Sequence, residues 1–394
     1  MIKTTLVGHA CLLIQSKETT ILTDPVWFDY LWEEINTLCP SIVLEKDKVP
    51  PLDVLNISHR HQDHFDVRTL AYLVKNKRIL TPDTLVLAPQ DNLLLDILNE
   101  LEFKNIRIVA DFEPIKVKDV TITPTPSRNQ LSTSEDPFPE HGLLVNDGEV
   151  TIWNQVDSLV NPDIIQHIIE LHGQIDFFHS RFVPLIEGNF SYNKPITLPI
   201  DEYCTFLNVV KALAPRFVVP GSAAFRYRDE LTFLNQYSFP TTQDQFLRDL
   251  EAFCPEVSRA PFFSGDIAHI SKDEIYIEKQ ASDFVRIKED NSQLITFKPN
   301  SEVPAIKTQT TDPEEYQREI KVVDDFIQKF FFERILKSDL LKGWQHWQIV
   351  YQLEVFGQDG PQTWTIDFGQ PKQLQLHKGE VGKINLYEGI SSSE

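Results

Sequence analysis

The sequence predicts a mixed α/β fold with helices outside a central pair of sheets, followed by a small C-terminal α+β lobe. Three observations predict it. Short apolar segments rich in β-branched residues and leucine alternate with helical segments up to about residue 290. Strands come first and helices are interleaved later, which is typical of sheets that pack face to face beneath outer helices. After that point the pattern changes to one long helix and then antiparallel strands.

The elements of this first part are assigned from apolar patterning and turn signals. The expected strands are residues 4–15, 19–26, 53–58, 84–89, two within 106–126, a hairpin over 143–157, then 175–182 and 216–221. The hairpin turn is placed at Asn146-Asp147-Gly148, because these residues adopt a positive φ at little cost. The expected helices are residues 66–76, 91–103, 163–173 and 201–214.

A separate C-terminal lobe is predicted over residues 312–394. Asp312 suits the N-cap of a helix, Pro313 suits its first position, and two glutamates follow in the first turn. Apolar residues alternate in WQHWQIVYQLEVF and TWTIDF, which predicts an antiparallel sheet. Residues 291–311, rich in Asn, Ser, Thr, Pro and Lys, are expected to link this lobe to a first domain of residues 1–290.

The composition excludes several classes of function. The 394 residues include 37 Lys and Arg against 58 Asp and Glu, so the net charge is −21 at pH 7. Unaided binding to nucleic acid or to an anionic membrane surface needs clustered basic residues, so we expect neither. No apolar run approaches the roughly 18 residues of a membrane span, and no secretory signal is visible at the start. The four cysteines lack CxxC spacing, so we expect free thiols and a cytoplasmic location.

One motif carries metal chemistry. The segment SHRHQDH places His59, His61, Asp63 and His64 directly after an apolar strand. Imidazole nitrogens and carboxylates are the ligands that borderline divalent metals prefer. Residues two apart at the end of an extended strand point the same way, so His59 and His61 can hold one ion. Asp63 and His64 can then face a second ion. The alternative is a polar loop that is rich in histidine for no chemical reason.

This HxHxDH motif resembles that of the metallo-β-lactamase superfamily. GHACLLI followed by ILTDP is similar to the opening of its lactonase-like and phospholipase-D-like branches, and the likeness covers roughly residues 1–270. The resemblance implies an αββα sandwich with a dinuclear metal site at one edge of the sheets. It also implies a third ligand on a downstream loop, a bridging Asp after the next strand, and a last His that closes the second site.

The sequence departs from the hydrolases of that superfamily at two of these ligands. The loop expected to carry the third ligand reads TPTPSRNQ and contains no His. The bridging Asp matches Asp157, but the last His is absent, since RFVVP is followed by GSAAFRYRD. The nearest downstream side chains that bind metals are Glu135, Asp136, Glu140 and His141.

These departures resemble the catalytic part of the CMP-N-acetylneuraminate hydroxylases. The likeness lies in IWNQVDS, in IDFFHSRFVPL followed by FSYN, in LAPRFVVPGSAAF and in WQHWQI. That branch, like the non-haem iron β-hydroxylase of chloramphenicol biosynthesis, has a carboxylate in place of the downstream His, and the match here falls on Glu140. The Rieske domain of the hydroxylases has no counterpart, because no CxH…CxxH pair is present. Oxygenase activity would therefore need an external electron donor.

Other polar residues are expected to lie near the site. The residues expected to orient ligating imidazoles are His9, Asp24 and His141. A purely structural pairing is an equal alternative for His9 and Asp24. The candidates for binding an anionic substrate are His179, Arg181 and Arg226, which follow strands expected to end at the metal edge. A solvated surface position is the alternative for these three.

Three functions from different classes fit these residues. The first is a non-haem iron oxygenase, since added carboxylates stabilise ferric iron. Its first iron would be held by His59, His61 and Glu140 and its second by Asp63 and His64, with Asp157 as the bridging ligand. In a hydrolase of a phosphodiester, lactone or amide, two zinc or manganese ions activate a water, and Asp63 or Asp157 takes its proton. A non-catalytic relative that binds metal or a partner is the third. We favour the oxygenase, with two divalent metal ions, iron before zinc or manganese, and a small-molecule substrate.

Overall fold

The computed structural model describes residues 1–31, 34–128, 139–184, 186, 196–222, 225–290, 296–299, 310–370 and 374–392. The chain divides into two compact units. The larger unit comprises Met1–Pro184, Pro199–Asn235 and Phe239–Phe297, and the smaller one Leu185–Leu198, Gln236–Ser238 and Lys298–Glu394. The domain boundaries predicted around residues 290 and 312 stay a prediction, because most of the expected linker lies outside the described residues.

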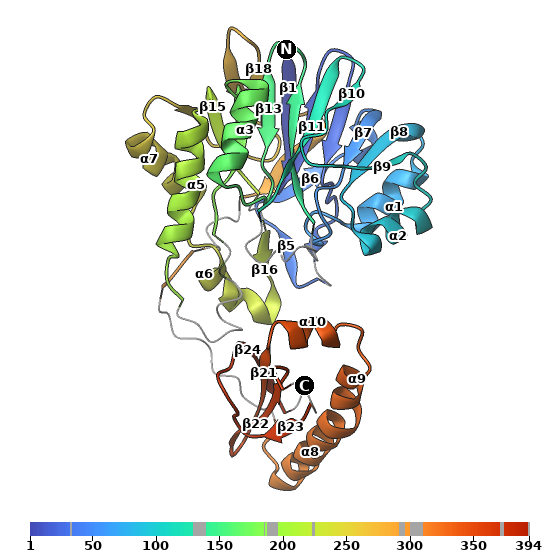
Figure 1. The fold of residues 1–394 in the computed structure, drawn as a ribbon, viewed down its shortest axis with the longest axis vertical. Coiled ribbons are helices and arrows are strands. Elements are labelled where there is room, and N and C mark those ends of the chain that lie inside the picture. Colours follow the sequence, from blue (N-terminus) through green and yellow to red (C-terminus); the bar gives the residue numbers. More distant parts are fainter. Residues whose placement is uncertain are drawn as a thin grey trace. The chain divides into compact units, whose positions relative to one another are not determined.

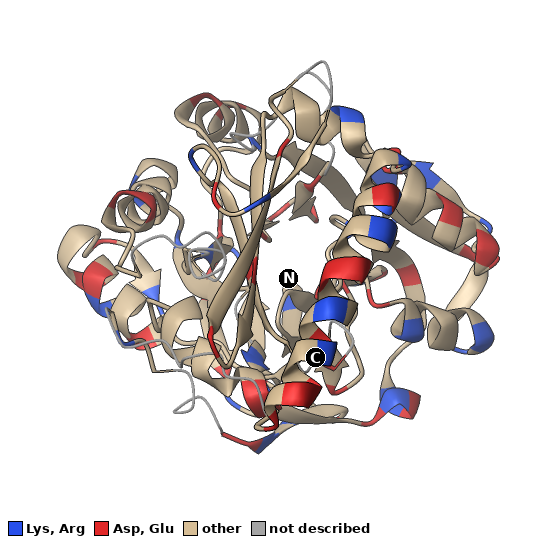
Figure 2. Cartoon of the chain, turned by 90° about the horizontal axis from the view of Figure 1, so that it is seen from below, with Lys and Arg blue, Asp and Glu red and all other residues tan. Residues whose placement is uncertain are grey.

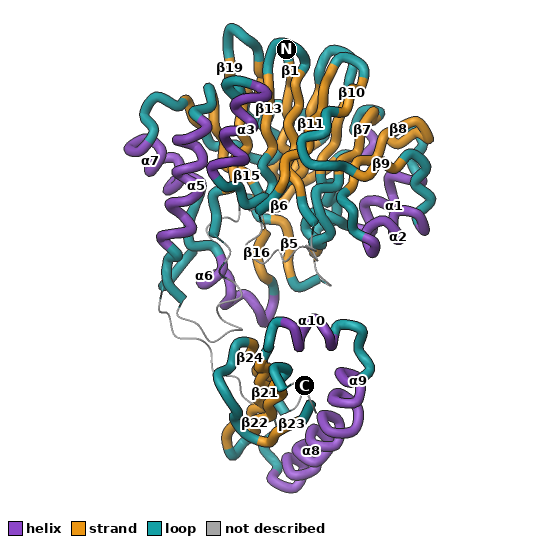
Figure 3. The backbone as a smooth tube through the Cα atoms, viewed as in Figure 1, coloured by secondary structure: helices purple, strands orange, loops and turns teal. Residues whose placement is uncertain are grey.

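Two large sheets form the centre of the larger unit (Figures 1 and 3). The eight-stranded sheet has the order β19 (Ile275–Glu278), β18 (Ile267–Ile270), β1 (Ile2–Gly8), β2 (Cys11–Gln15), β3 (Thr20–Thr23), β7 (Leu52–Asn56), β8 (Leu80–Ala88), β9 (Ile106–Ile108). The seven-stranded sheet has the order β10 (Ile115–Val117), β11 (Val120–Pro126), β12 (His141–Asn146), β13 (Thr151–Asn154), β14 (Phe177–Arg181), β15 (Phe217–Gly221), β17 (Ser258–Arg259).

Each sheet has an antiparallel half and a parallel half. Strands β3, β7, β8 and β9 pair in parallel in the first sheet, and β13, β14, β15 and β17 do so in the second. Parallel neighbours need a crossover connection, which is usually a helix. The crossover helices are α1 (Val67–Lys75), α2 (Asn92–Glu100), α3 (Pro162–His172), α5 (Ile200–Leu213) and α7 (Gln243–Phe253). In Figure 1, α1 and α2 lie on one flank of the strands and α3, α5 and α7 on the other.

Side-chain polarity fixes the start of these helices. Asp66, Asp91, Asn161 and Thr242 each accept a hydrogen bond from a backbone N–H of the first turn of α1, α2, α3 and α7. Such N-caps satisfy backbone donors that the helix leaves unpaired, and each stabilises the fold by about 1 kcal/mol.

The strands are buried on both faces, which defines the layers. On β12, Leu143 and Val145 belong to an apolar cluster that also contains Leu12 and Ile14 of the first sheet, so this cluster lies between the sheets. Leu144, between them in sequence, belongs to the other cluster, which includes the buried residues of the crossover helices. Because strand side chains alternate between faces, each sheet packs on the other sheet inside and on helices outside. The predicted αββα sandwich is confirmed.

Short elements near one end of the larger unit were not predicted. They are β4 (Tyr30–Leu31), β5 (Asn36–Leu38) and β16 (Phe225–Tyr227), which form a three-stranded sheet, β6 (Ser41–Leu44) paired with β20 (Val285–Glu289), η1 (Lys46–Lys48) and η2 (Asp229–Leu234). The short helix α6 (Asn235–Ser238), also not predicted, begins in the larger unit, and its last three residues belong to the smaller one. Strands of two to five residues carry too few alternating positions to be recognised from sequence.

The smaller unit contains a helical segment and a four-stranded sheet. Its helices are α8 (Pro313–Phe326), the π-helical η4 (Ile327–Phe331), α9 (Phe332–Leu336) and α10 (Leu341–His346). Its strands have the order β23 (Leu376–Lys378), β22 (Gly360–Asp367), β21 (Val350–Gly357), β24 (Leu386–Ser391). As predicted for the N-cap, Asp312 accepts hydrogen bonds from the first turn of α8.

One feature of this sheet corrects the sequence prediction. The sheet is mixed and not antiparallel throughout, because β24 pairs in parallel with β21. The chain crosses from β23 at one edge of the sheet to the other edge before it forms β24. Patterning within a strand reports its buried face but not the direction of its neighbour, so the sequence could not distinguish the two arrangements.

Acidic and basic residues are interspersed along the ribbon in Figure 2. Among the helices of the described part of the chain, none combines the length and the apolar character that a membrane crossing requires.

Candidate metal centre

The candidate ligands follow strands that end at the same edge of the larger unit. Both β1 and β3 lie antiparallel to β2, and β3 lies parallel to β7, so β1, β3 and β7 run in one direction. His9 follows β1, Asp24 follows β3, and the segment 58–64 follows β7. Asp157 follows β13 of the other sheet. Residues after the carboxyl ends of parallel strands are well placed to form a site.

The backbone is strained at four points of this edge. His9, Asp24, Val156 and Ser222 have φ values of 51°, 39°, 56° and 53°, and they follow the ends of β1, β3, β13 and β15. This left-handed region favours glycine, and a β-branched residue such as Val156 is a clear outlier there. Strained residues persist where the surrounding structure fixes them, and they cluster at functional sites.

Asp24 connects two of the predicted ligands from behind. Its Oδ1 accepts a hydrogen bond from the Ser58 backbone N–H at 2.7 Å, and its Oδ2 accepts one from the Ser58 hydroxyl at 2.6 Å. The same Oδ2 lies 3.0 Å from His64 Nδ1. A carboxylate only accepts, so Nδ1 of His64 carries a proton, and Nε2 is the nitrogen that faces the other candidate ligands. Since the Ser58 hydroxyl donates to Asp24, it accepts from His59 Nδ1 at 2.9 Å, which leaves a lone pair on His59 Nε2.

The first converging group consists of His9, Asp63 and His64. His9 Nε2 lies 3.2 Å from His64 Nε2 and 3.1 Å from Asp63 Oδ2, and His64 Nε2 lies 3.6 Å from the same oxygen. All three side chains are buried. Ligand atoms of this group lie within 4.8 Å of one another, as a shared metal ion requires.

The second group consists of His59, His64 and Asp157, again within 4.8 Å of one another. Asp157 Oδ2 lies 3.4 Å from His64 Nε2. His61 joins this group through His59, because its Nδ1 lies 2.9 Å from His59 Nε2. His64 belongs to both groups, so the two sets of donor atoms are adjacent.

Metal ligands bind in their deprotonated forms, and the electrostatic environment favours that form for each of these groups except His64, which would release a proton when an ion binds. Burial and the neighbouring His64 lower the pKa of His59, and burial lowers the pKa of His61. Burial alone would raise the pKa values of Asp63 and Asp157, but the charge of His64 holds both below their usual range. Burial opposes the charge on His64, yet Asp63 and Asp157 raise its pKa.

The arrangement of donor atoms fits a divalent cation. Imidazole nitrogens and carboxylate oxygens face one another in a buried space, and both His59 and His64 direct Nε2 into it. Facing lone pairs and carboxylates repel unless a proton or a cation lies between them. The set of nitrogen and oxygen donors suits zinc, iron or manganese.

Glu140 lies outside both converging groups. Its carboxylate accepts a hydrogen bond from the Ser127 hydroxyl. Burial raises its pKa, and the charges of Asp157, Arg181 and His64 also act on it, so it faces the same region. The other candidates named for the third ligand, Glu135 and Asp136, lie outside the described residues.

The two arginines predicted to bind substrate lie in different places. Arg181 ends β14, and its Nη1 donates to the backbone oxygen of Asp157. Arg226, on β16, lines a pocket of about 540 Å³ together with Arg228 and Lys288. Among the described residues, its Nε has no hydrogen-bonding partner.

The two remaining histidines of the prediction are fully buried and bonded to asparagines. His141 Nε2 lies 2.9 Å from Asn56 Oδ1, and His179 Nδ1 lies 2.8 Å from Asn154 Oδ1. Burial lowers the pKa of His141 to about 4 and that of His179 to about 3. Both rings are therefore neutral at pH 7. His141 orients Asn56 at the end of β7, and no contact to a predicted ligand side chain is among its described hydrogen bonds.

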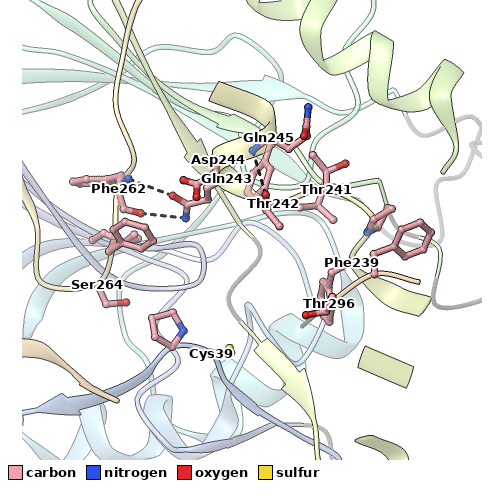
Figure 4. A pocket seen from close by; sticks show the side chains of 17 residues that line it. Cys39, Phe239, Thr241, Thr242, Gln243, Asp244, Gln245, Phe262, Ser264 and Thr296 are labelled. Carbon is pink, nitrogen blue, oxygen red and sulfur yellow. Dashed lines mark hydrogen bonds between the residues drawn. The ribbon is translucent and has the colours of Figure 1, made fainter. Parts of the chain in front are cut away.

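The larger unit also contains a largely apolar pocket. It has a volume of about 580 Å³ and is lined by five phenylalanines, Phe182, Phe239, Phe262, Phe263 and Phe297, with threonines, glutamines and Ser264. Figure 4 shows Phe262 and Ser264 on one side of it and Phe239 and Thr296 on the other. The Gln243 side chain exchanges two hydrogen bonds with the backbone of Phe262, which fixes that wall. The sequence did not predict this pocket, because its walls come from distant segments.

The pocket adjoins the first converging group through two contacts. A Cβ at Gly8, the residue before His9, would lie 3.6 Å from Ser264 Oγ. The ring of Phe225 lies 5.8 Å from that of His9 and 5.1 Å from that of Phe239. The ring of Phe225 thus connects the pocket wall at Phe239 to His9, although neither His9 nor Asp63 lines the pocket itself.

Comparison with known families gives one broad match. The sequence model of the family described as "Beta-lactamase superfamily domain" matches residues 3–222, which is more than half of the chain.

Individual relatives are distant. A Rieske 2Fe-2S iron–sulfur protein of Mycolicibacterium smegmatis is 28% identical over 200 residues, 48% of this chain and 36% of that protein. The 4-amino-L-phenylalanyl-(CmlP-peptidyl-carrier-protein) 3-hydroxylase of Streptomyces venezuelae is 27% identical over 174 residues, 43% of this chain and 32% of that protein. The chain thus spans about a third of the length of these curated relatives. A solved metallo hydrolase from the archaeon Ignicoccus hospitalis aligns with a TM-score of 0.46 and 16% identity, covering 71% of this chain and 98% of that one.

Proposed function

Since the chain belongs to the β-lactamase superfamily and is a metal-dependent enzyme of that fold, we propose that it is a dinuclear non-haem iron oxygenase that hydroxylates a small molecule. The superfamily resemblance predicted from the HxHxDH motif is confirmed. The closer likeness to the CMP-N-acetylneuraminate hydroxylases stays a prediction. The observation that carries the proposal is the carboxylate of Glu140, on the loop where the hydrolases have a histidine.

The position of Glu140 supports a carboxylate-rich centre. It is largely withdrawn from solvent, is held by the Ser127 hydroxyl, and lies near enough to Asp157 and His64 for their charges to act on its pKa. Bound cations would stabilise its ionised form, as they do for other ligating carboxylates. Together with Asp63 and Asp157 it would bring three carboxylates to the site, and hard oxygen donors favour iron in its higher oxidation state.

The ligands are assigned by residue. His59, His61 and Glu140 hold the first ion, Asp63 and His64 hold the second, and Asp157 lies between them. When bound, two irons would supply the activation of dioxygen and the storage of electrons. The chain's own residues orient the donors: Asp24 and Ser58 fix the tautomers of His64 and His59, and Arg181 holds the backbone oxygen of Asp157.

The pocket lined by phenylalanines supports an apolar part in the substrate. Pockets for small molecules are mostly apolar with a few polar groups that fix orientation, and this one offers the hydroxyls of Thr241 and Ser264 for that purpose. The contacts from Phe239 through Phe225 to His9 would connect a bound molecule to the metal edge. An anionic group on the substrate could meet Arg181.

The proposal requires electrons from outside these residues. The sequence contains no Cys/His set for a Rieske cluster, whereas a curated relative is named for one. We therefore include an external electron donor in the proposal. The relative from Streptomyces venezuelae, named as a 3-hydroxylase, supports hydroxylation as the reaction class.

Metal content and dioxygen uptake test the proposal. We expect two irons per chain after aerobic purification, and dioxygen uptake by the protein after chemical reduction. Glu140→His should shift the bound metal from iron toward zinc, because it removes one carboxylate, and Glu140→Gln should weaken the first site without that shift. Two zinc ions, no dioxygen uptake and hydrolysis of a phosphodiester, lactone or amide would instead establish the hydrolase. Unchanged iron in Glu140→Ala would place the third ligand elsewhere.

A further inference from the structure

We infer that His9 is a ligand of the second metal ion and takes the place of the histidine that is absent after β15. The sequence from Gly221 to Asp229 contains no histidine, so that the second site would have Asp63, His64 and Asp157 alone. The structure brings an imidazole to this position from the opposite end of the chain, through the turn after β1. The inference rests on the dinuclear centre of the proposed function but not on its redox chemistry.

The geometry separates His9 from a residue that only supports a ligand. Its Nε2 lies 3.1 Å from Asp63 Oδ2 and 3.2 Å from His64 Nε2. Those are the atoms that would hold the ion, because the other ring nitrogen of His64 is committed to Asp24. Asp24 thus lies behind His64, whereas His9 lies on the same side as the metal would.

The backbone supports the same role. His9 and Ala10 form the turn between β1 and β2, where Gly8 pairs with Cys11. His9 has a φ of 51°, which glycine or asparagine would adopt at lower cost. Strained non-glycine residues of this kind cluster at functional sites, which is consistent with a role for the His9 side chain there.

Neighbouring rings hold the imidazole in place. The ring of His9 contacts the ring of His64 edge to face at 4.9 Å and the ring of Phe225 at 5.8 Å. The side chain is buried, so it cannot turn toward solvent. A pre-oriented donor loses little freedom when it binds an ion.

Metal stoichiometry distinguishes a ligand from a hydrogen-bond donor to Asp63. The glutamine amide can donate to Asp63 as an imidazole N–H would, but it is a poor metal ligand. Under equilibrium dialysis with Co²⁺, we expect the number of bound ions per chain to fall from two to about one in both His9→Ala and His9→Gln. If His9 only donates to Asp63, His9→Gln should retain both ions, with at most the roughly 10–100-fold weaker binding typical of an orienting residue.

A cysteine variant gives a direct spectroscopic readout. In His9→Cys loaded with Co²⁺, a ligating thiolate would produce sulfur-to-cobalt charge-transfer absorption in the near ultraviolet, which imidazole ligands do not produce. The matched control is His269→Cys, which places a thiol at a histidine of β18 that is bonded to Glu278 and lies outside both converging groups. We expect the absorption in His9→Cys and not in the control or in the unaltered protein.

The outcomes that would overturn the inference are specific. Two bound ions in His9→Gln, whether or not His9→Ala loses one, in protein whose circular dichroism is unchanged, would exclude His9 as a ligand. So would a His9→Cys variant with two cobalt ions and no charge-transfer absorption. Neither result depends on iron or dioxygen, so failure of the oxygenase proposal would leave this inference standing, and the reverse also holds.

Discussion

At the scale of single residues, Asp24 has the widest influence on the candidate centre. It reaches His64 directly and His59 through the Ser58 hydroxyl, and it is fully buried. One oxygen, Oδ2, accepts both the hydroxyl and the imidazole proton. The orientation of both imidazoles therefore depends on a single carboxylate that would not touch the metal itself.

Asp24→Asn should weaken metal binding about 10–100-fold while the fold is kept. To satisfy the Ser58 backbone N–H, the amide must direct its oxygen there and its NH₂ toward Ser58 Oγ and His64 Nδ1. The NH₂ group donates, so it disfavours the tautomers that leave Nε2 free. Competition with a chromogenic chelator measures the affinity.

A matched control exists for this variant. Asp119 also accepts from two hydroxyls, of Ser16 and Thr19, and from one backbone N–H, of Glu18, and none of these residues belongs to the candidate centre. Asp119→Asn should leave metal affinity unchanged. Equal affinity in Asp24→Asn and Asp119→Asn would refute the orienting role of Asp24.

His61→Ala and Asp63→Ala should each remove bound metal and activity but leave the fold largely intact. Both residues lie on a loop after β7, and neither belongs to the apolar clusters that hold the sheets and helices together. Elemental analysis and circular dichroism check the two parts of this prediction. Full metal occupancy in either variant would contradict the assignment of the loop.

At the scale of elements, the close packing of β14 against β15 restricts which residue can end β15. A Cβ at Gly221 would lie 2.6–2.7 Å from ring atoms of His179, which is fully buried and bonded to Asn154. The ring cannot move away without breaking that hydrogen bond. Only glycine therefore fits at the end of β15.

Gly221→Ala should destabilise the larger unit by about 1–3 kcal/mol, the usual cost of overpacking a core. The same substitution in a His179→Ala background should cost less, because the ring that it would strike is gone. Denaturant unfolding of the four proteins in this cycle measures the coupling. If Gly221→Ala lowers the free energy of unfolding equally in both backgrounds, the His179 ring is not the cause of the loss.

The elements also show what the sequence could and could not predict. The segments 53–58, 175–182 and 216–221 correspond to β7, β14 and β15, because long apolar runs bounded by turn residues are distinctive. Strand β8 begins at Leu80, before the predicted residue 84, since Pro82 and Asp83 are typical of turns and tertiary packing overrode that preference.

For the site, local spacing was sufficient only within one loop. The HxHxDH segment placed His59, His61, Asp63 and His64 together without any knowledge of the fold. The sequence predicts the same orienting role for His9 and Asp24, because the side of His64 that each of them faces depends on the register of β1, β2 and β3. The pocket walls come from residues 6 to 297, and no local pattern could have joined them.

At the scale of the whole molecule, metal binding and folding are expected to be separable. The larger unit has one apolar cluster between its sheets and another beneath its helices, and the candidate ligands belong to neither. The protein should therefore fold without metal.

Removal of metal with a chelator should leave far-ultraviolet circular dichroism unchanged but lower the melting temperature. An ion that binds only the folded state adds about 2.7 kcal/mol when its free concentration is 100 times its dissociation constant. Differential scanning fluorimetry across a metal titration measures this gain. Loss of secondary structure on chelation would show that the ions are part of the folding core.

The hydrogen bonds of Asp24 also have a consequence for how the centre fills. Its carboxylate joins His59, which belongs with the first ion, to His64, which belongs with the second. An ion that binds at either imidazole fixes Ser58 and Asp24, and thereby orders the imidazole that awaits the other ion. The conformational entropy of these side chains is lost only when the first ion binds, so the second ion binds more tightly than the first. Loading should thus be cooperative, with a Hill coefficient above one that falls toward one in Ser58→Ala, where the link between the two histidines is cut.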